Sequence, residues 1–276
     1  MRLEIIKELE KSYLAIRIDQ RIIYSEFLER DVIADVYMPT INVDTSKLPL
    51  LLVNDGQDLR KMDFASILDP LIAEGIIEPI MVVALHCGAD RMMEYGTACQ
   101  PDYRGRGGKA GIYTRFIFDE MLPYVREAFG IKSFKEKSFA GFSLGGLSAI
   151  DIVWNHASEF VKVGVFSASL WWRRKGYNDE GYNSEKDRIM HLQVMKGKKS
   201  SWLKFFFECG TLDETLDRNN NGVIDSIDDA LDMIEHLKIL GYTDNDIRYM
   251  EIHDGRHNVE TWAQAFPDFL KWGWGK

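Results

Sequence analysis

The sequence has few cysteines, no long apolar segment and fewer basic than acidic residues. The three cysteines, Cys87, Cys99 and Cys209, form no even disulfide framework, so we expect buried free thiols in a reducing compartment. No apolar run approaches the roughly 20 residues that cross a bilayer. The first residues, 1–8, lack the apolar core of a signal peptide. These absences predict a soluble, cytoplasmic protein with no membrane partner.

The shortage of basic charge narrows the range of partners further. Lys and Arg number 34 against 43 Asp and Glu, which gives a formal net charge of −9. Nucleic acids and anionic membranes bind basic patches, so we expect neither as the main partner. The short basic run at 196–199 is interrupted by Gly197 and is typical of a solvated loop. The composition is that of an ordinary globular protein, and we expect a small molecule as its partner.

Short apolar runs alternate with helical patterns along the chain. The continuous runs at 48–54 and 79–86 are typical of strands buried on both faces. Further strands are expected at 31–38, 139–141, 161–166, 203–208 and 247–252, and helices at 113–128, 227–240 and 259–272. This alternation predicts a mostly parallel sheet with helices on both faces, in a single domain over 1–276. The first strands are expected to pair antiparallel at one edge, and the polar segment 173–201 is either a lid or a surface excursion.

A serine between glycines is the strongest functional signal in the chain. Ser143 lies in the stretch Gly-Phe-Ser-Leu-Gly at 141–145, between an expected strand and an apolar helical pattern at 146–154. A serine on so sharp a strand-to-helix turn is strained, its hydroxyl is exposed, and flanking glycines avoid collisions. The helix N-terminus behind it favours developing negative charge. The pattern therefore predicts that Ser143 is the nucleophile of a serine hydrolase.

Attack by a serine requires an imidazole base, and chain order selects among the six histidines. In α/β-hydrolases the serine is followed by the acid and then by the histidine, in a loop after the last strand. His253 and His257 both follow the expected strand at 247–252. His257 is deeper in the loop, beside a helix that begins near Asn258. We predict His257 as the base and keep His253 as the alternative.

The acid that orients the imidazole should follow the preceding strand. Three carboxylates stand in this region, at Glu208, Asp213 and Glu214. Glu208 falls within the expected strand, whereas Asp213 lies in the loop that follows a Gly-Thr pair. One residue of register separates Asp213 from Glu214. Asp213 is therefore the predicted acid and Glu214 the second choice.

The tetrahedral intermediate of acyl transfer requires two backbone N–H donors. One is expected from Leu144, directly after the nucleophile. The other is expected in the loop after the strand at 48–54, where Gly56 permits a turn and Gln57 follows. A plain turn at the end of a strand would produce the same residues. This chemistry needs no metal or other cofactor for catalysis.

With these residues placed, the chain resembles the Putative esterase family of α/β-hydrolases. That family includes esterase D, enterochelin-esterase-like enzymes and feruloyl or acetyl-xylan esterase domains. The resemblance runs from about Asp31 to Trp272 and is carried by stretches at 50–58, 90–95, 140–146, 167–172 and 255–262. Many relatives have His-Gly where this chain has Asp55-Gly56, which is similar to the enterochelin-esterase-like branch.

The resemblance implies an α/β-hydrolase fold, a small carboxylic ester as substrate, and a triad of Ser143, His257 and Asp213. It also implies which residues border the substrate pocket, namely Arg91, Glu94, Tyr95, Trp171 and Trp172. For the two tryptophans, packing in the core is an equal alternative.

A second motif begins four residues after Asp213. Residues 217–228 match a calcium loop, with oxygen ligands at loop positions 1, 3, 5, 7 and 12 and a glycine at position 6. The ligands would be Asp217, Asn219, Asn221, the carbonyl of Val223, and Asp228. Aspartate at the last position resembles the dockerin-type loop. We expect a structural Ca²⁺ in this insertion that rigidifies the segment carrying the acid, with a polar Asn-rich turn as the alternative.

Together the residues predict a serine esterase that hydrolyses a carboxylic ester through an acyl-enzyme. Acyl transfer to an alcohol by the same residues is an alternative, which product analysis with and without an acceptor separates. A different class is a non-catalytic carbohydrate- or protein-binding module that uses Trp171, Trp172 and the calcium loop. That class requires an inactive triad. The acyl group, the alcohol and the oligomeric state stay open.

Overall fold

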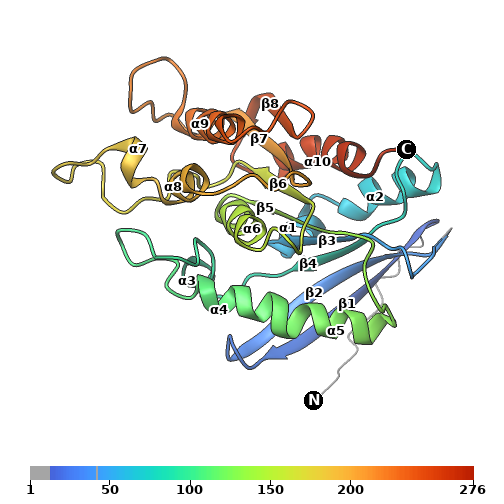
Figure 1. Cartoon of the computed structure of the whole chain (residues 1–276). Coiled ribbons are helices and arrows are strands. Elements are labelled where there is room, and N and C mark those ends of the chain that lie inside the picture. Colours follow the sequence, from blue (N-terminus) through green and yellow to red (C-terminus); the bar gives the residue numbers. More distant parts are fainter. Residues whose placement is uncertain (1–12, 42) are drawn as a thin grey trace.

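One eight-stranded sheet forms the centre of the molecule (Figure 1). This computed structural model describes residues 13–41 and 43–276, so the segment 1–8 that bears on a signal peptide lies outside it. The strands are β1 (Ile16–Ser25), β2 (Arg30–Pro39), β3 (Leu50–Asn54), β4 (Met81–Leu85), β5 (Lys137–Phe142), β6 (Lys162–Phe166), β7 (Lys204–Leu212) and β8 (Ile247–Arg256).

The strand order is β1-β2-β4-β3-β5-β6-β7-β8. Pairing is parallel from β4 to β8, whereas β1 and β2 join antiparallel at one edge. This arrangement confirms the predicted α/β-hydrolase sheet and its antiparallel edge. Because the parallel strands run in one direction, the loops after β3, β5, β6, β7 and β8 meet at the same end of the sheet.

The central strands are buried on both faces, which explains their continuous apolar sequences. In β3, Leu50 and Leu52 pack into one core while Leu51 and Val53 pack into the other. Because side chains alternate along a strand, a single apolar run supplies both layers of helices with contacts.

Helices cover each face of the sheet (Figure 1). One face packs against residues of α4 (Ala110–Arg115), η1 (Phe116–Met121), α5 (Leu122–Phe129), α6 (Leu144–Asn155), α8 (Ile189–Lys196) and α9 (Asp225–Ile239). The other packs against α1 (Gly56–Lys61), α2 (Phe64–Ala73) and α10 (Val259–Trp274). Two single-turn helices, α3 (Arg91–Glu94) and α7 (Ser184–Asp187), lie in loops. Among the described residues, no helix has the length and apolarity to span a bilayer.

Three details differ from the sequence-based expectations. Strands β7 and β8 run four residues further than predicted, to Leu212 and Arg256, so Asp213 and His257 directly follow the strand ends. The segment 173–201, expected as a lid or a surface excursion, contains α7 and α8, and α8 packs into the core. Cys99 is exposed rather than buried, and Cys87 is only partly buried.

Strand β5 and helix α6 approach each other very closely at Gly141, and this contact can be tested by mutation. A Cβ on Gly141 would lie 2.4 Å from the carbonyl oxygen of Gly145, a backbone atom that cannot move aside. We expect Gly141→Ala to lower the free energy of unfolding by at least about 2 kcal/mol. Gly273→Ala is the control, because the nearest atom to its Cβ would be Lys162 Cδ at 3.6 Å. Urea unfolding measures both, and equal stabilities would contradict the packing described.

Candidate active site

Ser143 occupies a strained turn between β5 and α6. Its backbone has φ 55° and ψ −123°, a conformation that residues with a Cβ rarely adopt. Its N–H donates to the carbonyl of Phe166 at 2.9 Å, and its carbonyl accepts from Gly146 at 3.1 Å. The side chain is half-buried although its neighbours on both sides are buried. The turn therefore leaves Ser143 partly exposed between buried neighbours, as predicted for a nucleophile elbow.

Glycine on each side is what allows this turn to form. As described above, Gly141 leaves no room for a Cβ, and a Cβ on Gly145 would lie 2.5 Å from Oδ2 of Asp55. The first contact brings β5 against α6, and the second brings α6 against the loop after β3. The packing of α6 against β5 and against the loop after β3 therefore holds Ser143 in its strained conformation.

Strand register places Asp213 and His257 side by side. Leu212 in β7 pairs with Arg256 in β8 across a local bulge, and Asp213 and His257 are the residues that follow. Neighbouring strands lie about 4.8 Å apart, so the two loops begin next to each other. The alternative base, His253, points into solvent, with a side chain that is 90% exposed and paired with Asp254. The geometry therefore favours His257 over His253.

Trp262 in α10 connects His257 to the strand that carries Ser143. Its ring stacks on Phe142, with ring centroids 4.8 Å apart, and meets the edge of the His257 imidazole at 5.4 Å. Its Nε1–H donates to Ser167 Oγ at 3.0 Å. The ring therefore contacts the residue before the nucleophile and the predicted base together. No hydrogen bond joins Ser143 to His257, or His257 to Asp213, within the part of the chain that the structure describes.

The charges around His257 are those of a neutral base next to an acid. Partial desolvation lowers the pKa of His257, the negative charge of Asp213 opposes this, and the positive charge of Arg91 adds to it. Burial raises the pKa of Asp213, against hydrogen bonding from Ser167 and the charge of His257. Asp213 Oδ2 accepts the N–H of Gly210 at 3.2 Å, and Oδ1 has no partner among the described residues. That oxygen is free to accept an imidazole N–H.

The two predicted oxyanion donors stand at neighbouring helix N-termini. Leu144 is the first residue of α6, and Gln57 is the second residue of α1. The first N–H groups of a helix have no partner within that helix. Because β5 and β3 pair in parallel, the helices that follow them begin side by side. Gln57 is held by its side chain, whose Oε1 accepts the N–H of Cys87 at 3.1 Å.

The residues implied to border the pocket divide into two groups. Arg91 and Trp171 are partly exposed, and Arg91 makes a bidentate ion pair with Asp55 at 2.7 Å. Three others are almost fully buried, with Glu94 at 1% exposure and Tyr95 and Trp172 at 0%.

Glu94, Tyr95 and Trp172 were expected to border the pocket, but the structure buries them and gives them partners in the core. Glu94 makes a bidentate ion pair with Arg30, at 2.7 and 2.6 Å, which anchors α3 on β2. The Tyr95 hydroxyl accepts the N–H of Asp55, and Trp172 packs with the sheet. For Trp172 the core alternative holds, and Glu94 and Tyr95 support the site from behind.

Sequence reasoning missed the environment of Glu208. This side chain lies in β7 at 1% exposure, where it accepts a long hydrogen bond of 3.4 Å from Ser167 Oγ. Burial, together with the negative charge of Asp213, raises the pKa of Glu208 to about 8. A carboxyl that is neutral at pH 7 therefore lies beneath the predicted acid. The run of apolar residues that precedes Glu208 in β7 is the signal that would have indicated it.

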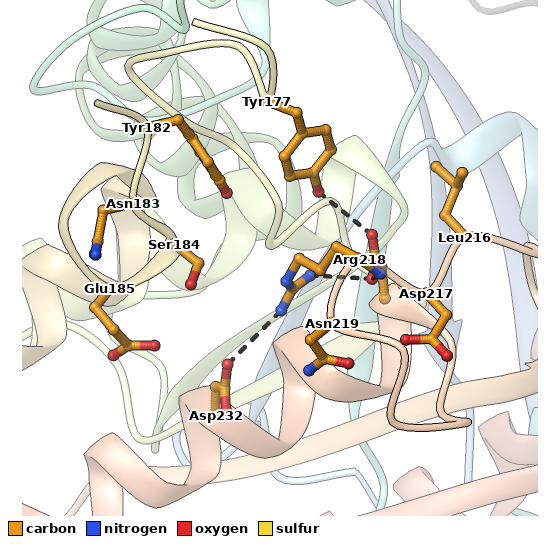
Figure 2. A pocket seen from close by; sticks show the side chains of 11 residues that line it. Tyr177, Tyr182, Asn183, Ser184, Glu185, Leu216, Asp217, Arg218, Asn219 and Asp232 are labelled. Carbon is orange, nitrogen blue, oxygen red and sulfur yellow. Dashed lines mark hydrogen bonds and ion pairs between the residues drawn. The ribbon is translucent and has the colours of Figure 1, made fainter. Parts of the chain in front are cut away.

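The predicted calcium loop lies beside a large pocket of about 720 Å³ (Figure 2). Asp217 accepts the N–H groups of Asn221 and Gly222, at 3.1 and 2.9 Å. The amide groups of Asn219 and Asn221 both donate to the carboxylate of Asp228, at 2.8 and 3.1 Å. Among the described residues, no three His, Cys, Asp or Glu side chains gather as a metal centre. The calcium site therefore stays a prediction.

The fold and the turn at Ser143 together define an α/β-hydrolase. Comparison with known proteins gives the family: residues 25–272 match the family described as "Putative esterase". Because the match covers most of the chain, this protein belongs to that esterase family. No curated protein sequence matches the chain.

Solved structures with the same fold are esterases of several kinds. The enterobactin esterase FES from Shigella flexneri superposes with a TM-score of 0.71 at 18% identity, over 93% of this chain and 58% of that one. The siderophore hydrolase EstB from Aspergillus nidulans gives 0.67 at 18% identity, over 92% and 94%. A ferulic acid esterase gives 0.65 at 17% identity, over 94% and 98%. This chain thus spans little more than half of the Shigella enzyme, and likenesses at these identities establish the fold alone.

The buried Glu208 carboxyl predicts a pH-dependent stability. Its pKa is about 8 in the folded protein and near 4.5 when unfolded, so the folded state binds the extra proton between these values. The free energy of unfolding should therefore fall as the pH rises from about 4.5 to about 8. Glu208→Gln should flatten this fall and be more stable than the parent at pH 8. Urea titrations across this range measure it, with Glu251→Gln on the exposed face of β8 as the control; an unchanged slope in Glu208→Gln would contradict the assignment.

Proposed function

We propose that the protein is a serine esterase that hydrolyses a small carboxylic ester through an acyl-enzyme. The Ser143 hydroxyl attacks the acyl carbonyl while His257 accepts its proton. The N–H groups of Leu144 and Gln57 stabilise the oxyanion, and Asp213 holds the imidazole in the required tautomer. His257 then returns the proton to the departing alcohol. Water, activated by the same imidazole, cleaves the acyl-enzyme and regenerates the serine.

The conformation of Ser143 is the observation that carries this proposal. A serine at φ 55° persists only where the surrounding structure enforces it, and here two glycine contacts do so. Strand register then brings Asp213 and His257 to the same end of the sheet. Catalytic hydrogen bonds that are long without substrate commonly tighten when it binds, so the open spacing at His257 is compatible with the mechanism.

Membership of the esterase family and the names of the related structures support the proposed substrate class. Enzymes named for enterobactin, siderophores and ferulic acid share this architecture. Their names support a small-molecule ester as the partner of this chain. The predicted steps need no cofactor, because the nucleophile, base, acid and oxyanion donors are all side chains or backbone of the chain.

Replacing the nucleophile tests the proposal directly. Ser143→Ala should lower the turnover of p-nitrophenyl acetate at least about a thousandfold, because only binding and oxyanion stabilisation remain. Ser148→Ala, further along α6, is the matched control and should stay within a few-fold of the parent. The absorbance of the released nitrophenolate follows the steady-state reaction. Retained activity in Ser143→Ala would refute the assignment.

We also propose that residues 217–228 bind a structural Ca²⁺. The support is the loop itself: Asp217 caps it through two N–H groups, and two predicted ligands already contact Asp228. Its oxygen donors suit a hard cation, and only two of the predicted ligands, Asp217 and Asp228, are carboxylates, which favours weak binding. Bound calcium would stiffen the chain between Asp213 and α9.

Calcium should therefore raise the melting temperature of the protein. With Ca²⁺ at about ten times its dissociation constant, we expect a rise of roughly 2 to 5 °C. Magnesium at the same concentration should act less, since it prefers a smaller octahedral site. Asp217→Asn combined with Asp228→Asn should abolish the rise. An equal rise in the double variant, or none in the parent at millimolar calcium, would sink the proposal.

A further inference from the structure

Arg173 carries a buried guanidinium that no carboxylate of the described residues neutralises. The residue is 8% exposed. Its Nη1 donates to the carbonyl of Trp171 at 3.4 Å, and its Nε has no hydrogen-bond partner among the described residues. Removing a charge from water costs several kcal/mol unless a partner compensates for it. Among the described residues, no carboxylate compensates for the desolvation of this guanidinium. The missing partner points to an anionic ligand.

Other arginines of the chain show what the free edge of Arg173 can hold. Four of them direct Nε and Nη2 at a single carboxylate: Arg30 at Glu94, Arg60 at Asp35, Arg91 at Asp55 and Arg106 at Asp102. The planar fork of donors matches a carboxylate or a phosphate. Arg173 presents the same edge without an acidic partner among the described residues.

Aromatic rings hold the Arg173 guanidinium in place without using that edge. Its Cζ lies 3.7 Å from the ring centroid of Tyr177, 5.3 Å from that of Tyr103 and 5.6 Å from that of Trp171. Cation–π contacts offset part of the desolvation cost. They satisfy no N–H donor, however, and among the described residues no hydrogen bond uses Nε.

Arg173 lines a pocket of about 270 Å³ together with Arg104 and Arg106. Arg104 is exposed and makes no ion pair within the described ranges, and Arg106 already pairs with Asp102. Two acidic residues, Glu214 and Asp225, line the same pocket.

The two acids leave the pocket with an excess of positive charge. Burial and the nearby charge of Asp225 raise the pKa of Glu214 to about 7, so this carboxyl is partly neutral at physiological pH. The Asp225 carboxylate accepts the N–H of Arg218 at 2.8 Å and the hydroxyl of Tyr177 at 3.4 Å. Its oxygens are therefore engaged away from Arg173.

Two residues that line the pocket stand close in the chain to residues of the proposed catalytic site. Trp171 lines it and lies two residues after Ser169, whose N–H donates to the carbonyl of Ser143 at 3.1 Å. Glu214 lines it from the other side and directly follows Asp213. The pocket shares Tyr177, Leu216 and Asp225 with the larger pocket of Figure 2, so the two pockets are neighbours.

We propose that Arg173 anchors an anion subsite that selects esters carrying a carboxylate or phosphate group. The inference rests on the proposed esterase function and specifies its substrate class. The ester bond would lie at Ser143 while the anionic group enters the pocket and meets the free Nε–Nη2 edge. Tyr177 and Trp171 would line the part of the substrate that connects the two.

The first experiment compares charged and neutral esters of equal length. The probes are mono-4-nitrophenyl esters of linear dicarboxylic acids, each beside its methyl-capped neutral counterpart, and an ω-phosphono series distinguishes phosphate from carboxylate. The parent should prefer the charged member by roughly 10- to 100-fold in kcat/KM, as charge-assisted hydrogen bonds allow. Arg173→Gln should remove this preference and Arg173→Lys should keep part of it.

Arg174→Gln is the matched control, since the adjacent Arg174 is exposed and pairs with Asp187 at 3.3 Å. This variant should retain the full preference. Equal kcat/KM for charged and capped esters in the parent, or an unchanged preference in Arg173→Gln, would overturn the inference while the esterase proposal stands. Because removing an uncompensated buried charge seldom destabilises, we expect Arg173→Gln to fold; if it does not, Arg173→Lys carries the same comparison.

A binding measurement separates the subsite from catalysis. In the Ser143→Ala protein, ligand-observed NMR should detect phenylphosphonate or benzoate but not neutral benzamide, and Arg173→Gln in that background should abolish the signal. Binding of benzamide equal to that of the anions would show simple aromatic stacking and overturn the inference. If no ester is turned over by the parent, the function proposal fails and this measurement alone decides the subsite.

Discussion

The contact between β5 and α6 at Gly141 and Gly145 is the constraint on which the site depends. A Cβ on Gly141 would meet the backbone of Gly145, and a Cβ on Gly145 would meet the Asp55 side chain in the loop after β3. The chain must therefore turn sharply between them, and Ser143 takes the strain of the turn. The free energy of packing on both sides of the sheet compensates for that strain. The position of the Ser143 hydroxyl therefore depends on the packing of the core.

From this turn the rest of the site follows through strand order. Parallel strands end at one edge of the sheet, and β5, β7 and β8 bring Ser143, Asp213 and His257 to that edge. Trp262 then links the ends, since it contacts both Phe142 and the His257 imidazole. Beneath Asp213, the protonated Glu208 avoids a second negative charge. The burial that packs the core around β7 thus also keeps Glu208 neutral, so that Asp213 is the negative charge beside His257.

The sequence predicted the sheet and the helical stretches of α4–α5, α6, α9 and α10, because apolar periodicity reports burial directly. It did not predict α1, α2 or α8. It located Ser143 because a glycine pair around a serine is a local pattern. It could not predict that Glu94 is a core residue, because its partner Arg30 lies 64 residues away on another strand. For the same reason the unpaired state of Arg173 was invisible: it depends on which acids the fold places nearby. Long-range pairing of charges is information that a single sequence does not carry.

The central claim is that Ser143 becomes a nucleophile because His257 accepts its proton, and covalent labelling tests this most directly. The folded protein is treated with a fluorophosphonate, and the modified peptide is identified by mass spectrometry. The account predicts one adduct, at Ser143, formed far more slowly in His257→Ala although that variant stays folded. An adduct on another residue, or labelling of Ser143 at the same rate without the imidazole, would contradict it.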